Sequence, residues 1–262
     1  MIAQEDPAFA ELAAAVLART GLDLRAYQTP QFMRRLRMFA AREGARDLHE
    51  YARILWQDES RAAAFQDFFS INVSEFFRNP DRFLYLYDHI LPDLARRFPD
   101  LKIWSAGCAN GAETYSLAIL MHRYGYMRSW EILGTDIDPA ALREASEGCY
   151  RQGMLKSVPA GWLEPHLWQE NGCWKVRPSL RRYVRFRRHD LIRDPYPVGQ
   201  HLIACRNVVI YLIPAAREKV WQKMTMALAV GGVLFIGGTE SILDARSLGL
   251  EPIAPCFFRR VR

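Results

Sequence analysis

The sequence has no apolar run long enough to cross a membrane. A membrane-spanning helix needs about 20 consecutive apolar residues, and no run in these 262 residues approaches that length. The N-terminal segment begins acidic and has no basic stretch ahead of an apolar one, so it makes a poor secretory signal. We therefore expect a cytoplasmic protein without direct membrane insertion.

Cysteine is scarce, with five residues and no CxxC spacing. An odd number of scattered cysteines indicates neither a disulfide framework nor a zinc site, and it fits a reducing compartment. Cys108 and Cys205 lie in apolar segments, where we expect small buried hydrophobes. Because the histidines also lack a spacing suited to metal, we predict no metal site.

Acidic residues are outnumbered by basic ones, 29 to 35, which gives a formal net charge of +6. The basic residues cluster at 34–42, at 181–188 and at the C-terminus. Such clusters are either solvated faces that aid solubility or surfaces that dock on an acidic partner. No recognised nucleic-acid-binding module is present, and an acidic protein fits the same charge. We therefore predict no nucleic-acid partner.

The first 70 residues favour helices throughout. Apolar residues recur at helical spacing in four segments, and no strand-like alternation interrupts them. The segments are Ala8–Leu17, Phe32–Ala41, Leu48–Trp56 and Ala62–Phe69. We predict a helical domain over residues 1–70, then a junction motif and a linking helix, about Asp81–Arg97, within residues 71–100.

From Leu101 onward strands and helices alternate, which is typical of a parallel sheet. We predict an α/β domain over residues 101–262, with a small antiparallel β insertion at about 157–187. The insertion rests on two strand candidates, Cys173–Val176 and Tyr183–Phe186, on either side of a Pro-Ser turn. Beyond it we predict a strand at His201–Cys205, a helix at Pro214–Ala229, a turn at Gly231–Gly232 into a strand at Val233–Ile236, and an edge hairpin strand at Cys256–Val261.

Residues 104–119, WSAGCANGAETYSLAI, are the most informative segment. An apolar run enters a small-residue loop that holds Gly107 and Gly111, and an amphipathic segment leaves it. A second apolar run, Glu131–Leu133, leads to Asp136, about one βαβ unit downstream. In such sites the glycines let backbone approach a nucleotide, and the acid accepts hydrogen bonds from its ribose. The spacing differs from the dinucleotide pattern GxGxxG and favours S-adenosylmethionine.

Three further motifs sharpen this interpretation: INVSEFFRNP at 71–80, CRNVVIYL at 205–212 and GGVLFIGGTES at 231–241. Together with the glycine loop and GTDID at 134–138, they resemble the chemotaxis receptor methyltransferase family (CheR) in order and spacing, from about residue 5 to the C-terminus. The resemblance implies a Rossmann-like methyltransferase sheet with helices on both faces, a helical N-terminal domain and a small antiparallel insertion. It implies methyl transfer from S-adenosylmethionine to receptor glutamates, with S-adenosylhomocysteine as the product.

The resemblance also implies roles for individual residues. In the family an asparagine, a hydroxyl residue and an arginine of the junction motif contact the cofactor. Glu113 matches the acid that bonds the donor's polar end, Asp136 the ribose acid, and Asp190–Leu191 the adenine side. Arg206 and Asn207 open the loop after the fourth sheet strand, where open sheets bind ligands. The cofactor-binding candidates are Asn72, Ser74, Arg78, Glu113, Asp136, Asp190, Leu191, Arg206 and Asn207.

Arg78 and Tyr211 are the catalytic candidates, because the family places both beside the methyl group. An arginine fork suits the orientation of a carboxylate, and a tyrosine hydroxyl can hydrogen-bond the acceptor. Structural interpretations stay open: a surface ion pair for Arg78, a first-turn helix position for Glu113 and a core position for Tyr211. An aspartate at 190, where the family commonly has asparagine, is a mild departure.

The resemblance implies the cytoplasmic coiled-coil domain of chemotaxis receptors as the partner of a monomeric enzyme. The basic helix carrying Arg34, Arg35 and Arg37 would dock on this acidic ridge, with Arg34 and Arg37 on one face. The short insertion, with Gly172 as its glycine, indicates the type that needs no tether to a receptor's C-terminal peptide. Two alternatives remain: an inactive, cofactor-binding signalling adaptor, and a methyltransferase with another acceptor, such as RNA or a small molecule.

Overall fold

The chain packs as two compact units. The computed structural model describes residues 6–27, 29–58, 60–69, 74–125 and 129–262, apart from the side chain of residue 67. One unit comprises Met1–Ile71 and Ile210–Glu218, and the other comprises Asn72–Val209 and Lys219–Arg262. Among the described residues, no helix combines the length and the apolar character that a membrane crossing requires.

The first unit is helical, as the apolar spacing predicts. Three of its helices begin at a residue whose side chain accepts a backbone N–H, namely Asp6, Thr29 and Asp47, and such caps satisfy donors that a helix start leaves without partners. The helices are α1 (Pro7–Thr20), η1 (Leu24–Tyr27), α2 (Pro30–Arg42), α3 (Leu48–Gln57) and α4 (Ser60–Phe69).

Aromatic rings fill the core of the helical unit. Phe39 stacks on Phe68 with ring centroids 4.1 Å apart and meets Tyr51 edge to face at 5.7 Å. Tyr51 and Phe65 are fully buried, and burial raises the pKa of the Tyr51 hydroxyl well above its usual value. The segment after the 205–212 motif joins this unit, because the Ile213 N–H donates to the Ala26 carbonyl at 2.8 Å.

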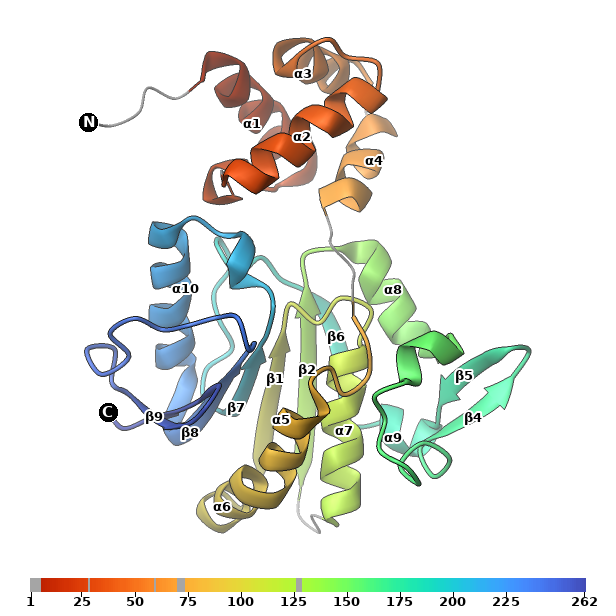
Figure 1. The fold of residues 1–262 in the computed structure, drawn as a ribbon, viewed down its shortest axis with the longest axis vertical. Coiled ribbons are helices and arrows are strands. Elements are labelled where there is room, and N and C mark those ends of the chain that lie inside the picture. The colour runs from red at the N-terminus through yellow and green to blue at the C-terminus, as the bar shows by residue number, and fades with distance from the viewer. Residues whose placement is uncertain (1–5, 28, 59, 70–73, 126–128) are drawn as a thin grey trace. The chain divides into compact units, whose positions relative to one another are not determined.

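The second unit is built on a seven-stranded mixed sheet with strand order β6-β2-β1-β7-β8-β10-β9. Its first five strands run parallel, since β1 pairs with β2 and β7, β2 with β6, and β7 with β8. Figure 1 shows β1, β2 and β7 side by side. The strands are β1 (Leu101–Ala106), β2 (Trp130–Asp136), β6 (Val184–Arg188), β7 (Gln200–Cys205), β8 (Leu228–Ile236), β9 (Leu250–Ala254) and β10 (Phe257–Arg260).

Helices cover this sheet and supply its apolar packing. The predicted linking helix is interrupted by a π-helical turn, so that it reads as three consecutive pieces. The helices of this unit are α5 (Pro80–Tyr85), η2 (Leu86–Ile90), α6 (Leu91–Arg97), α7 (Ala112–Tyr124), α8 (Pro139–Glu147), η3 (Gln152–Leu155) and α9 (Pro178–Arg181). Two more helices, η4 (Val209–Tyr211) and α10 (Pro214–Ala227), are divided between the two units. Asp138 caps α8, because its carboxylate accepts the Ala140 N–H.

A second sheet of three antiparallel strands has the order β3-β5-β4 and confirms a small β insertion. Its strands are β3 (Cys149–Tyr150), β4 (Leu167–Glu170) and β5 (Cys173–Val176). The predicted pairing of Cys173–Val176 with Tyr183–Phe186 is wrong, however. The Pro178-Ser179 pair begins α9 instead of a turn, and Val184–Arg188 then joins the main sheet parallel to β2.

Two predictions at the C-terminal end of the sheet are also wrong. Cys256–Val261 does not supply the edge strand: β10 lies between β8 and β9, and β9 forms the edge. Gly231 and Gly232 do not turn into a strand but lie inside β8. A Cβ on Gly232 would come within 2.9 Å of the Ala229 carbonyl oxygen and 3.0 Å of that of Gln200. Glycine therefore permits a close backbone approach where the β7–β8 register shifts.

Cysteine pairing is a further correction. Cys149 and Cys173 form a disulfide between β3 and β5, with Cα atoms 5.8 Å apart. The antiparallel pairing of these strands brings the Cα atoms within disulfide range, although no local spacing indicates it. Cys108 and Cys205 are buried free thiols, as predicted, and burial raises the pKa of both.

Candidate active site

The glycine loop after β1 is held in an uncommon backbone conformation. Gly107, Ala109 and Gly111 have φ angles of 74°, 46° and 84°, in the left-handed region that glycine adopts without strain. The N–H groups of Gly107 and Cys108 donate to the carbonyl of Thr135 at 2.8 and 2.9 Å. These bonds fix the loop to the end of β2.

Packing within the chain occupies the space beside both glycines. A Cβ on Gly107 would lie 2.4 Å from a methyl carbon of Val208, and one on Gly111 would lie 2.8 Å from the Cβ of Ala145. The sequence interpretation, that these glycines let backbone approach a ligand, is therefore incomplete. At these two positions the missing side chain also lets the loop pack against the 206–209 segment and α8.

Asp136 ends β2 and faces the glycine loop. One carboxylate oxygen accepts the Ala109 N–H at 2.7 Å, and the other accepts the Asp138 N–H at 3.0 Å. The residue is partly exposed. Burial nevertheless raises the pKa of the carboxyl above its usual value, against the opposing effect of the backbone N–H groups. A carboxylate held by two backbone donors has a fixed direction and lone pairs left for a ligand.

Glu113, in the first turn of α7, is held by two side chains. Ser105 donates its hydroxyl to one carboxylate oxygen at 2.9 Å, and Arg206 donates a guanidinium N–H to the other at 3.3 Å. The Glu113 side chain is 14% exposed and that of Arg206 only 2%. Burial raises the pKa of Glu113, and the nearby guanidinium opposes the rise.

Arg206 connects this acid to the junction motif. Its guanidinium also donates to the backbone carbonyl of Arg78 at 2.7 Å and to the side-chain oxygen of Asn79 at 3.1 Å. The same group lies over the rings of Phe83 and Phe235, 5.1 and 4.5 Å from their centroids. Arg206 is thus a buried residue that holds Glu113 and the backbone of the junction motif, and its contact with a cofactor stays a prediction.

The junction motif is anchored by further backbone bonds. Phe77 donates its N–H to the Ser116 hydroxyl at 2.9 Å, and Phe76 donates to the Met154 carbonyl at 3.0 Å. Phe77 and Asn79 have positive φ angles of 52° and 61°, which non-glycine residues adopt at a cost when the surroundings enforce it. Ser74 and Arg78 are partly exposed on this segment. Asn72 lies outside the described residues.

Glu240 is a residue of the site that the sequence interpretation missed. Its carboxylate accepts the N–H groups of Asn207, Val208, Val209 and Gly237 at 2.7–3.1 Å. These bonds tie the loop after β7 to the loop after β8 and hold Asn207 at a φ of 60°. The glutamate belongs to the GGTES motif, which is the signal in the sequence that points to it.

Asn207 carries an unsatisfied polar atom. Its side-chain oxygen is buried without a hydrogen-bond partner among the described residues. A buried acceptor without a donor is costly, and the residue lies at the carboxyl end of β7, where open sheets bind ligands.

Asp190 and Leu191 follow β6 beside Asp136. The link is direct, since the His189 N–H donates to the Asp136 carbonyl at 2.9 Å. Asp190 is buried, and one of its carboxylate oxygens accepts the Ile192 N–H at 2.7 Å. Leu191 is 9% exposed. The strand register thus brings the ends of β1, β2, β6 and β7 to one edge of the sheet.

The remaining candidates lie in the helical unit. Tyr211 ends η4 within the 210–218 segment and is partly exposed. On α2, Arg34 and Arg37 are exposed, whereas Arg35 is partly buried and donates to the Phe68 carbonyl at 3.2 Å. Among the residues that the structure describes, no three His, Cys, Asp or Glu side chains form a metal-holding group.

Comparisons with known proteins match both units. Residues 7–70 match the CheR methyltransferase all-alpha domain, and residues 72–250 match the CheR methyltransferase SAM binding domain. The chain is 36% identical over 239 residues to the chemotaxis protein methyltransferase of Listeria monocytogenes, covering 91% of each protein. It is 28% identical over 250 residues to that of Salmonella typhimurium, covering 92% of this chain and 85% of the relative.

Solved structures resemble the chain more distantly. A TehB-like SAM-dependent methyltransferase from Corynebacterium glutamicum is 19% identical, with a TM-score of 0.38 over 64% of this chain and 83% of its own. CalS10, an amino pentose methyltransferase from Micromonospora echinaspora with bound SAM, is 20% identical, with a TM-score of 0.36 over 60% and 49%.

Proposed function

The chain belongs to the CheR methyltransferase family, and from this premise we propose that it methylates glutamate side chains of chemotaxis receptors, with S-adenosylmethionine as donor. The structural observation that best supports this proposal is the edge of the main sheet where the carboxyl ends of β1, β2, β6 and β7 meet. There Asp136 and the glycine loop lie beside Glu113 and the 206–207 loop, on strands paired in register.

The residues at this edge fit the donor chemically. Asp136 offers an oriented carboxylate for a ribose diol, and Asn207 offers a buried side-chain oxygen that lacks a donor. Glu113 offers negative charge for the donor's ammonium group. Because Glu113 is buried and already paired with Arg206, this second cation would further stabilise its ionised form. These residues would hold the donor together with Ser74, Arg78, Asp190 and Leu191, while Arg206 positions Glu113.

The chemistry asks little of acid–base catalysis. When bound, S-adenosylmethionine supplies an electrophilic methyl group on a sulfonium. An acceptor glutamate is already ionised at neutral pH, because its reference pKa is about 4.3, so the protein needs no general base. Its residues have two tasks: to align the carboxylate oxygen with the methyl–sulfur bond, and to exclude water from charges that fade during transfer.

Arg78 and Tyr211 are the residues that we propose for the acceptor. Arg206 holds the backbone of Arg78 and also bonds Glu113. The Arg78 side chain therefore extends from a fixed backbone position. An arginine fork orients a carboxylate, and the Tyr211 hydroxyl would donate to the same group. Both are proposed to act by orientation, since a tight grip on the ground-state carboxylate would not speed the transfer.

Replacement of Tyr211 by phenylalanine tests this assignment. Loss of one orienting hydrogen bond is expected to lower kcat for receptor methylation about tenfold, with donor affinity unchanged, because the hydroxyl contacts the acceptor alone. Single-turnover methylation and calorimetric titration of S-adenosylhomocysteine separate the two effects. A variant with normal turnover would remove the hydroxyl from the mechanism.

The partner surface that we propose is the exposed face of α2. Arg34 and Arg37 are exposed along this helix, and the coiled-coil domain of a receptor presents an acidic ridge of matching charge. Arg35 is set aside, because its guanidinium lies over the Phe68 ring, 5.1 Å from the centroid, and donates to the Phe68 carbonyl.

Reversal of charge at Arg34 and Arg37 is expected to raise the KM for receptor several-fold and to flatten its dependence on salt. Contacts between exposed charges are screened over about 10 Å at 0.1 M salt, so wild-type KM should rise with salt while the variant's KM should not. Arg35→Gln is the matched control on the same helix, and donor affinity should be unchanged in both. Wild-type rates across a salt series in the double variant would refute the docking surface.

The function itself is tested by incubating the protein with donor labelled in the methyl group and with bacterial membranes that contain receptors. Base-labile label on a receptor-sized band is the expected result, because glutamate methyl esters hydrolyse in base. Donor binding without transfer would instead support an inactive signalling adaptor. Label on RNA or on a small molecule would replace the acceptor class.

A further inference from the structure

A basic pocket of about 870 Å³ lies between α8, β6 and the small antiparallel sheet. Its lining contains none of the residues that we assign to the donor or the acceptor. Five cationic residues line it, against the single carboxylate of Glu147, and they come from four different elements. The cations are Arg143, Lys175, Arg181, Arg187 and Arg188.

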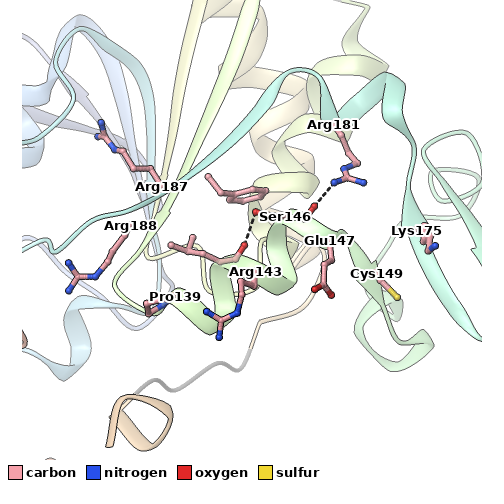
Figure 2. A pocket seen from close by; sticks show the side chains of 11 residues that line it. Pro139, Arg143, Ser146, Glu147, Cys149, Lys175, Arg181, Arg187 and Arg188 are labelled. Carbon is pink, nitrogen blue, oxygen red and sulfur yellow. Dashed lines mark hydrogen bonds between the residues drawn. The ribbon is translucent and has the colours of Figure 1, made fainter. Parts of the chain in front are cut away.

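The cations are spread along the pocket (Figure 2). Arg187 and Arg188 lie at one end, Arg143 lies beside Glu147 in the middle, and Arg181 and Lys175 lie toward the small sheet. The lining also contains two apolar residues, Leu142 from α8 and Phe186 from β6. Several positive charges beside apolar side chains suit a ligand that joins anionic groups to an apolar or aromatic part.

Several parts of the wall are held in place before any ligand arrives. Arg181 donates to the Ser146 carbonyl at the end of α8, and Phe186 packs edge to face on Tyr115 with ring centroids 5.6 Å apart. Cys149 lines the pocket and is bonded to Cys173, so the disulfide ties β3 to β5 at the wall that carries Lys175. A preformed wall lowers the ordering cost of binding.

Protection of a sheet edge explains only part of this charge. β6 is an edge strand of the main sheet, and charged side chains on edge strands deter pairing with other chains. That role covers Arg187 and also Arg185, which is exposed on the same strand but outside the pocket lining. It does not cover Arg143 on α8 or Arg181 on α9, which add charge to the same hollow.

We propose that this pocket is a binding site for a phosphorylated small molecule of nucleotide size. Ligand pockets commonly measure about 300–1,000 Å³, and this one lies in that range. Four of the five cations are arginines, whose planar fork matches phosphate oxygens. Phe186 and Leu142 offer an apolar surface to a base. None of its lining residues is among those that we assign to the methyl donor, and binding there would extend the function of the chain beyond methyl transfer.

The test is calorimetric titration of the full chain with GTP and with inorganic tripolyphosphate, after the donor site has been filled with S-adenosylhomocysteine. Neither probe carries adenine, so binding at the donor site should not contribute to the measured heat. Both probes are expected to bind, GTP more tightly because of its base, and affinity should fall as salt rises.

Arg143→Gln and Arg187→Gln should each weaken GTP binding about tenfold, since each removes one charged hydrogen-bond donor. Arg185→Gln is the matched control and should bind as wild type does. No binding of either probe overturns the proposal, as does an equal loss in the control, which would indicate unspecific attraction. Binding of a glutamate-rich peptide in place of both phosphates would assign the pocket to an acidic protein. Receptor methylation is measured in parallel. If the protein methylates receptor but binds neither probe, the pocket proposal fails while the proposed function stands.

Discussion

Replacement of Arg206 by methionine is expected to reduce the free energy of unfolding by about 3–5 kcal/mol, the usual cost of removing one partner from a buried ion pair. The Arg206 side chain is only 2% exposed and its partner Glu113 only 14%. Without the guanidinium, the Glu113 carboxylate would lose a charged donor, and the carbonyl of Arg78 would lose its 2.7 Å bond. Methionine suits the site sterically, because it can pack between the Phe83 and Phe235 rings that Arg206 now contacts.

A double variant separates the charge from the packing. Adding Glu113→Gln to Arg206→Met removes the charge that would otherwise remain buried, so much of the lost stability should return. Urea unfolding followed by circular dichroism measures the four corners of this double-mutant cycle. If Arg206→Met alone unfolds at the wild-type midpoint, or if Glu113→Gln gives no recovery, the pair does not stabilise this edge of the sheet.

Replacement of Asp136 by asparagine is expected to weaken S-adenosylhomocysteine binding about tenfold to a hundredfold, the loss typical of a charged hydrogen bond. The amide cannot accept both N–H groups that the two carboxylate oxygens now accept, so the direction of the side chain also changes. Asp138→Asn is the matched control two residues away. Asparagine caps helices as well as aspartate does, and affinity should be unchanged. Equal calorimetric affinity in the Asp136 variant would remove this residue from the donor site.

Asp136 and Glu113, the two acids that we assign to the donor site, predict how donor binding responds to pH. Burial raises the pKa of both Asp136 and Glu113, and a cationic donor favours their ionised forms. Affinity should therefore be highest where both carboxyls are ionised and fall as the pH drops through these raised values, which lie above those of an ordinary carboxyl at about 4. Donor binding should lower both pKa values and release protons. In Asp136→Asn the fall should be shallower, because one of the two titrating groups is gone.

The local pattern of the chain was sufficient to predict much of the fold and part of the site. Periodicity identified the four long helices of the first unit, and the run of apolar residues, glycines and acid identified the β1–α7–β2 segment with Gly107 and Asp136. These features depend on residues close together in the sequence, where spacing, propensity and capping act directly.

The tertiary structure decided what depends on partners distant in sequence. Whether Val184–Arg188 pairs in a hairpin or with β2, and whether β9 or β10 forms the edge, are choices between strands of similar composition, and only long-range pairing selects one. Cys149 and Cys173 meet because two strands align. Arg206 points inward because Glu113, 93 residues away, pairs with it, and Glu240 acts through backbone N–H groups more than 30 residues away. A residue type and its neighbours do not say which distant group will satisfy its charge, so these roles emerge only when the chain is folded.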